Sequence, residues 1–214
     1  MYKKKILALC AVFSAVVLFP LSSESLTTDP KKLKYLPLDF NPPKTERVTL
    51  ENGMILHLFE DHELPIISVH AFFKTGSAFE PEDKTGLASL TGTLMRTGGT
   101  VSKTVEEIDE NLEYIAANVS IDFGFDKGNA SLTVLKKDID TGLEMWADML
   151  MYPSFPQDKI EIEKNKEIES IRRENDSPHS IVSREFSKIV FNGSPQGRFP
   201  TVDSIKKISR DDLV

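Results

Sequence analysis

Residues 86–95 read Gly-Leu-Ala-Ser-Leu-Thr-Gly-Thr-Leu-Met and have the apolar spacing of a buried helix. Leu87, Leu90 and Leu94 recur at spacings of three and four residues, which predicts a helix with one buried face. Thr97-Gly98-Gly99 follows directly, and glycine is common just after the last helical turn. We therefore expect a short, largely buried helix from Gly86 to about Arg96.

Three strands are predicted before this helix. Arg47–Leu50 and Met54–Phe59 flank Asn52-Gly53, and an Asn-Gly pair favours a tight hairpin turn because both residues tolerate positive φ. Ile66–Phe73 is a third run rich in β-branched and aromatic residues. The chain should thus enter its first helix from a predominantly antiparallel sheet.

Helices and strands continue to alternate after residue 99. Thr104 and Glu107 have the spacing of a capping box, and the apolar residues that follow repeat with helical spacing. The remaining patterns predict helices at about 105–115, 143–150, 156–173, 183–190 and near 209, and strands at 119–125 and 130–134. This order favours an α+β fold: a two-layer sandwich of a largely antiparallel sheet with helices packed on one face.

Composition narrows the possible functions. The 214 residues are 40% apolar and 28% charged, which is typical of a chain that buries a sizeable core. The net charge is −7, and no long basic stripe is present. We therefore expect neither nucleic acid nor an anionic lipid surface as a partner.

The first 23 residues resemble a secretory signal. Three lysines at positions 3–5 precede an apolar run from Ile6 to Leu21, which is short for a membrane span. We expect export, into the periplasm if the source is Gram-negative, with an uncleaved membrane anchor as the alternative. The only cysteine is Cys10, inside this run, so the mature chain should form no disulfide and no thiolate metal site.

Four prolines between residues 24 and 45 predict an extended lead-in, because proline restricts both itself and the preceding residue. The folded domain should therefore occupy residues 46–214. Asp211-Asp212-Leu213-Val214 has the character of a helix beginning, so we expect this domain to be incomplete at its C-terminus.

Catalytic patterns are scarce. The histidines are His57, His62, His70 and His179, and no two have the spacing of three or four that would direct both rings at one metal from a helix. Glutamates repeat along the predicted helix 156–173, but lysines and arginines alternate with them. This pattern favours a solvated, salt-bridged helix surface.

Several stretches, in their order and spacing, resemble the N-terminal domain of the pitrilysin/insulinase family of zinc peptidases, in the branch that includes mitochondrial processing peptidase. The resemblance covers about residues 44–214. It is carried by Leu50-Glu-Asn-Gly-Met54, Phe73-Lys-Thr-Gly-Ser77, Gly86-Leu-Ala88, Thr104-Val-Glu-Glu-Ile-Asp109, Ala147-Asp-Met-Leu150, Pro153-Ser-Phe-Pro156, Arg172-Arg-Glu-Asn-Asp-Ser-Pro178 and Ile208-Ser-Arg-Asp-Asp-Leu213.

The resemblance implies where a zinc site would lie. Active members carry His-x-x-Glu-His on the helix after Gly-Leu-Ala, with a glutamate about 76 residues downstream as third zinc ligand. Here the three motif positions are Ser89, Gly92 and Thr93. Counting 76 residues reaches Glu169, whereas aligning Ile171-Arg-Arg-Glu174 puts Ser170 there. We therefore expect no catalytic residues, no metal ligands and no bound zinc.

The resemblance also implies a role. The family contains degenerate subunits that pair with a zinc-bearing one to enclose a peptide, so we expect a non-catalytic subunit whose partners are an active zinc-peptidase homologue and unfolded peptide, in a hetero- or homo-oligomer. The peptide would add as a strand, with Ile66–Phe73 as the candidate edge and a central strand as the alternative for the same residues. Two alternatives remain: a zinc metalloendopeptidase with an atypical site that draws on Glu163, Glu167 or Glu169 with His179, and a truncated, non-functional remnant.

Overall fold

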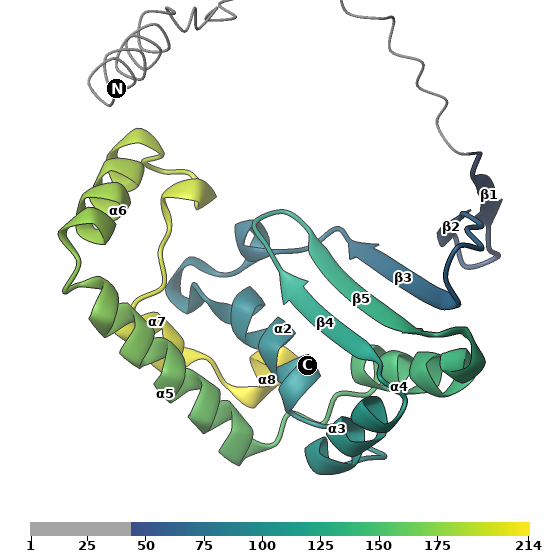
Figure 1. The fold of residues 1–214 in the computed structure, drawn as a ribbon. Coiled ribbons are helices and arrows are strands. Elements are labelled where there is room, and N and C mark those ends of the chain that lie inside the picture. Colours follow the sequence, from purple (N-terminus) through teal and green to yellow (C-terminus); the bar gives the residue numbers. More distant parts are fainter. Residues whose placement is uncertain (1–43) are drawn as a thin grey trace, which may run out of the picture. The chain divides into compact units, whose positions relative to one another are not determined.

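The computed structural model describes residues 44–214 (Figure 1). The expected signal, residues 1–23, and nearly all of the lead-in, residues 24–45, lie outside this range. The chain divides into two units after Glu60, and each unit is described by itself.

The described part of the first unit is a β-hairpin. Strand β1 (Glu46–Thr49) pairs antiparallel with β2 (Ile55–Leu58). The Asn52 side-chain oxygen accepts the Met54 N–H at 3.0 Å, and Gly53 has a φ of +84°, a conformation that glycine adopts without strain. The Asn-Gly pair thus forms the turn that its sequence favours.

The second unit is built on a three-stranded antiparallel sheet. Strand β5 (Gly128–Leu135) lies between β3 (Ile66–Phe73) and β4 (Asn118–Phe123). Leu132 of β5 is opposite Val69 of β3 and Val119 of β4. Alternate residues of β5 are fully buried, because successive side chains point to opposite faces of a sheet and one face carries the core.

Helices cover that buried face. Helix α2 (Leu87–Thr97) packs against β4, and α4 (Ile139–Met151) packs against β5. Between them in sequence, α3 (Val105–Tyr114) begins with the predicted Thr104–Glu107 capping box. The core side chains of these helices include Leu94, Ile108 and Met149. The fold is therefore α+β, with helices packed on one face of an antiparallel sheet, as predicted.

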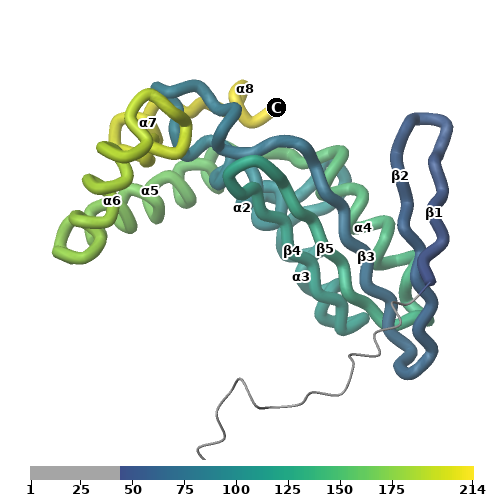
Figure 2. The backbone as a smooth tube through the Cα atoms, turned by 90° about the horizontal axis from the view of Figure 1, so that it is seen from above, coloured from purple at the N-terminus to yellow at the C-terminus, as the bar shows by residue number. Residues whose placement is uncertain are grey.

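The C-terminal helices form a group beyond α2. Helix α5 (Gln157–Glu174) packs on α2 and on α7 (Val202–Lys207), and the chain ends with α8 (Arg210–Leu213). Figure 2 shows α5, α6 (Pro178–Val190) and α7 together at the opposite end of this unit from β3. Single 3-10 turns complete the unit: η2 (Ser77–Phe79), η3 (Glu82–Lys84), η4 (Lys136–Asp138) and η5 (Pro195–Gly197).

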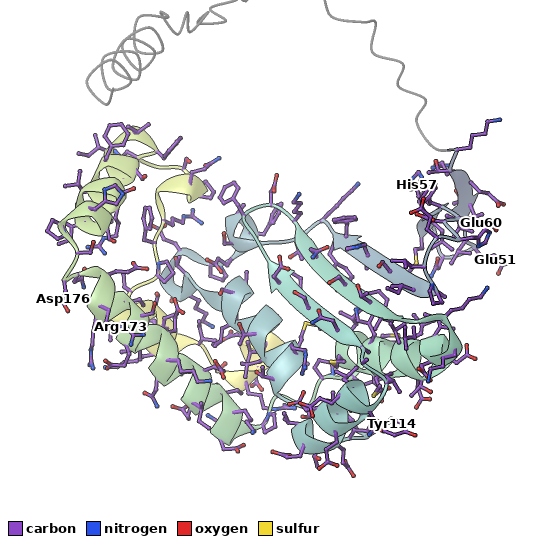
Figure 3. All side chains as sticks on the ribbon, in the orientation of Figure 1. Glu51, His57, Glu60, Tyr114, Arg173 and Asp176 are labelled. Atoms are coloured by element: carbon purple, nitrogen blue, oxygen red, sulfur yellow. The ribbon has the colours of Figure 1, made fainter. Side chains whose placement is uncertain are left out.

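Helix α6 differs from the other long helices because none of its side chains is buried. Its apolar residues Val182, Phe186 and Ile189 are spaced along one side and are 65–78% exposed. Figure 3 shows Arg173 and Asp176 where the chain passes from α5 towards α6. Among residues 44–214, none of the helices has the length and apolar character needed to cross a membrane.

Candidate functional site

The position of α2 is set by a buried carboxylate. Glu80 is only 8% exposed, and its two oxygens accept the backbone N–H groups of Gly86 and Ala88 at 2.9 Å each. Gly86 has a φ of +105°, and a Cβ there would come within 2.5 Å of Ile205 Cδ1. A helix N-terminus carries unpaired N–H groups and a positive partial charge, so a carboxylate fixes both its place and its direction.

A pocket of about 240 Å³ lies between α2 and α5. On α2 its wall is formed by Ser89, Leu90 and Thr93. On α5 it is formed by Glu163, Lys166, Glu167 and Ser170. Residues three or four apart share one side of a helix, so each helix presents a single face to the pocket.

Of the two carboxylates that line the pocket, one has a cationic partner and the other has none within residues 44–214. Glu163 has a side chain only 15% exposed, and its carboxylate pairs with Lys166 Nζ at 2.7 Å. Glu167 forms no ion pair with any other residue of the range 44–214. Loss of hydration, and then the negative charge of Glu174, raise the pKa of Glu167 above its ordinary value. Glu167 therefore lacks the countercharge that Glu163 has.

Only one of the two candidates for the third zinc-ligand position lies in the pocket wall. Ser170 lines the pocket together with Ser89 and Thr93. Glu169 is not part of the wall: its side chain is 55% exposed and its carboxylate pairs with Arg172 at 2.5 Å. The expected salt-bridged surface is thus present at Glu169, whereas Glu163 and Glu167 belong to the pocket.

Gly92 lies on the side of α2 that approaches β4. A Cβ built at this position would come within 3.0 Å of Phe123 Cδ2 and 3.3 Å of the Asp122 Cα. These distances are shorter than ordinary carbon–carbon contacts. Glycine therefore permits the close approach of helix and strand.

The histidines lie elsewhere. His57 is on β2, His62 precedes β3, and His70 is an exposed residue of β3 (His57 is labelled in Figure 3). His179 is in the first turn of α6 and does not line the pocket. Within residues 44–214, no three His, Cys, Asp or Glu side chains come together as a metal-binding group.

The residues of the pocket do not fit zinc. A protein zinc site uses about three nitrogen, sulfur or carboxylate ligands. The pocket wall contains no histidine, its three hydroxyls would have to lose protons to become anionic ligands, and Glu163 is already paired with Lys166.

Comparison with known proteins identifies the family. Residues 58–199 match the sequence profile of the insulinase family, peptidase family M16. The chain belongs to this family. Over 160 residues it is 22% identical to an uncharacterized zinc protease of Rickettsia felis, covering 75% of this chain and 38% of the relative.

Similar proteins include one named as a peptidase subunit and one named as a non-peptidase. A probable mitochondrial-processing peptidase subunit beta of Arabidopsis thaliana is 22% identical, covering 80% of this chain and 32% of that protein. A protein of Helicobacter pylori named non-peptidase homolog YmxG is 24% identical, covering 72% of this chain and 36% of that protein. The chain thus spans less than two fifths of the length of these relatives.

The fold is also that of the family. The crystal structure of a peptidase M16 inactive domain from Pseudomonas fluorescens superposes with a TM-score of 0.73 at 23% identity, covering 79% of this chain and 42% of that chain. The sequence predictions of family and fold class are both confirmed. The sequence favoured a solvated surface for α5 and named Glu163 and Glu167 only for the alternative of an atypical site. Both line the pocket with Ser170, because the spacing of the three residues places them on one helical face.

Proposed function

We propose that the chain is an exported, non-catalytic member of the insulinase family that binds unfolded peptide and pairs with an active zinc-bearing homologue. One observation carries the proposal: Ser89, Thr93 and Ser170 meet in a single pocket. The family resemblance puts two zinc ligands at Ser89 and Thr93, and puts the third at Ser170 when the helix is aligned by Ile171-Arg-Arg-Glu174. The name of the Helicobacter pylori relative, a non-peptidase homolog, agrees with loss of activity within the family.

The chemistry of the pocket supports binding rather than hydrolysis. Without ligands for zinc, no group of the pocket can lower the pKa of a bound water to make a nucleophile at neutral pH. The position expected to hold the general base is Gly92, which has no side chain. The pocket does retain a hollow shape and a net negative charge, which are properties of a binding site.

Peptide can be held by an unpaired strand edge. In the described chain, β3 and β4 each pair on one side only, with β5, so both leave main-chain N–H and C=O groups for an added strand. Helix α2, which forms one wall of the pocket, packs against β4. We place the peptide at β4 for this reason, and Ile66–Phe73 in β3 remains a second edge available to a partner.

Rebuilding the zinc ligands tests the alignment. The triple variant Ser89→His, Thr93→His, Ser170→Glu is expected to bind one zinc ion per chain, measured by titration calorimetry and by metal analysis after dialysis. Gly92 is left unchanged because an added side chain would crowd Phe123.

The matched control is Ser89→His, Thr93→His, which keeps the native Glu169 and Ser170. It should bind zinc at least about tenfold more weakly, because Glu169 points away from the pocket and two histidines leave the ligand set incomplete. Failure of the folded triple variant to bind zinc, or equal binding by the control, would contradict the assignment of the three positions.

A further inference from the structure

The pocket between α2 and α5 lacks one positive charge. Glu163 and Lys166 neutralise each other through their 2.7 Å contact, and Lys166 is mostly exposed, so it reaches in from the rim. Glu167 is then the one carboxylate of the wall without a cation. Glu174 lies seven residues later on the same helical face and adds to the negative field.

The remaining residues of the pocket wall can contact a long basic side chain. Leu90 gives an apolar contact, and Ser89, Thr93 and Ser170 contribute hydroxyl oxygens that can accept hydrogen bonds. Lysine and arginine join an apolar stem to a charged, donor-rich head, so they match a cavity with both kinds of wall. A cavity of about 150 Å³ already holds a benzene-sized ligand, so 240 Å³ admits one such side chain.

We propose that this pocket receives a lysine or arginine side chain of a bound peptide, with the Glu167 carboxylate as its counter-ion. The proposal rests on the proposed function, because it takes the peptide to lie along β4 beside α2. The negative charges of Glu167 and Glu174 disfavour an anionic ligand. A metal ion needs about three ligands, and the pocket offers one unpaired carboxylate. Glu167 is thereby assigned a specificity role without any role in bond cleavage.

Two peptides that differ in one charge test the proposal. An unstructured, fluorescein-labelled peptide with a single central lysine is compared with the same peptide carrying norleucine, which keeps the alkyl stem and lacks the ammonium. Fluorescence anisotropy with the full chain should show about tenfold tighter binding of the lysine peptide, the usual effect of one charge-assisted contact. The substitution Glu167→Gln should remove that preference while leaving the affinity for the norleucine peptide unchanged.

Glu161→Gln is the matched control, since Glu161 is on the same helix and outside the pocket wall. It should keep the tenfold preference, and urea unfolding should show that both variants are folded. Equal affinity of the two peptides for the wild-type chain would overturn the pocket proposal and leave peptide binding intact. Absence of binding by either peptide would instead overturn the proposed function. Competition by N-acetyl-lysine amide as effective as by the peptide would show that a free amine, not a peptide, is the ligand.

Discussion

Glu80 and Lys164 are charged side chains that are each only 8% exposed, and each is stabilised mainly by backbone groups. Glu80 accepts the first N–H groups of α2, and Lys164 donates to two carbonyl oxygens at the end of α7. A buried charge is costly unless hydrogen bonds replace its hydration. Their burial therefore marks positions where a helix end has to be held in place.

Removing the carboxylate of Glu80 should loosen α2. Glu80→Ala is expected to lower the free energy of unfolding by about 2–3 kcal/mol, because two backbone N–H groups lose a charged acceptor. Glu80→Gln should cost less, since the amide oxygen still accepts one bond. Urea unfolding measures both. The exposed neighbour Glu82 is the control, and a Glu82→Ala effect as large as that of Glu80→Ala would contradict the capping role.

Asp212 gives the fold an acid-sensitive contact. The Lys84 ammonium, followed by the N–H and hydroxyl of Ser209, lowers the pKa of Asp212 from 3.8 to about 2. A pKa that is lower in the folded state stabilises the fold above the unfolded pKa, and this contribution is lost as the pH falls.

We therefore expect the free energy of unfolding of the wild-type chain to fall more steeply between about pH 4 and pH 2 than that of the Asp212→Asn variant. The variant has no carboxylate at position 212 to protonate. Urea midpoints measured at half-unit pH steps follow this loss. Parallel pH curves for the two proteins would show that the Asp212 contacts do not contribute to the fold in solution.

The sequence predicted the local structure correctly where that structure depends on side chains close together in the chain. Asn52-Gly53 forms its turn, and Thr104 with Glu107 forms its capping box. It left the choice between Glu169 and Ser170 open, because adjacent helix positions differ by about 100° in direction and only packing shows which one faces α2. The roles of Glu80 and Lys164 depend on contacts made after folding and had no local signal.

At the scale of elements, α5 is held to α7 by one lysine. Lys164 Nζ donates to the carbonyl oxygens of Lys206 and Ile208 at 3.0 and 2.9 Å. The last carbonyls of a helix have no partner within it, and a lysine near them satisfies both their hydrogen bonds and the negative end of the helix dipole. The contact joins elements more than 40 residues apart in sequence.

Lys164→Met should lower the free energy of unfolding by about 2 kcal/mol, because it keeps the alkyl stem but leaves two carbonyls unpaired. Lys188→Met, which removes an ion pair whose two partners are both exposed, should change it by less than about 0.5 kcal/mol. Urea unfolding compares the two. Equal effects would mean that the Lys164 contacts with α7 contribute little.

Most elements could be predicted because their periodicity is strong. The strand Ile66–Phe73 has the bounds that the sequence predicts, and α2, α4 and α5 differ from prediction by a few residues at their ends. Helix α7 was missed, because six residues are too few to show a helical repeat and its capping pair, Thr201 and Ser204, lacks the usual glutamate or glutamine.

At the scale of the whole molecule, two kinds of surface are left uncovered by the described residues. Strands β3 and β4 each leave one edge unpaired within the described residues, and α6 exposes apolar side chains along one side. Exposed strand edges and apolar patches are typical of surfaces that pair with another chain. The sequence analysis named Ile66–Phe73 as a candidate edge, with a central strand as the alternative, and these residues form β3 at one edge of the three-stranded sheet. No sequence signal indicated that α6 would be unburied.

The proposed pairing predicts a defined complex in the cell envelope. Gentle extraction followed by size-exclusion chromatography and mass spectrometry should recover the chain with an equal amount of a homologue that contains His-x-x-Glu-His. Zinc in the complex should correspond to one ion per pair and disappear when the partner is removed. Recovery of the chain alone, in a sample that contains stoichiometric zinc, would contradict both the pairing and the non-catalytic assignment.

The close approach of Gly92 to β4 bears on how a zinc site and a general base could be rebuilt in this chain. On the proposed alignment, histidines at 89 and 93 and a glutamate at 170 would enter an existing hollow, whereas a side chain at 92 would crowd Phe123 of β4. On this alignment zinc binding and hydrolysis are separable properties. Substitutions at 89, 93 and 170 would supply metal ligands within an open hollow, whereas a general base at 92 would in addition need Phe123 and the β4 backbone to give way.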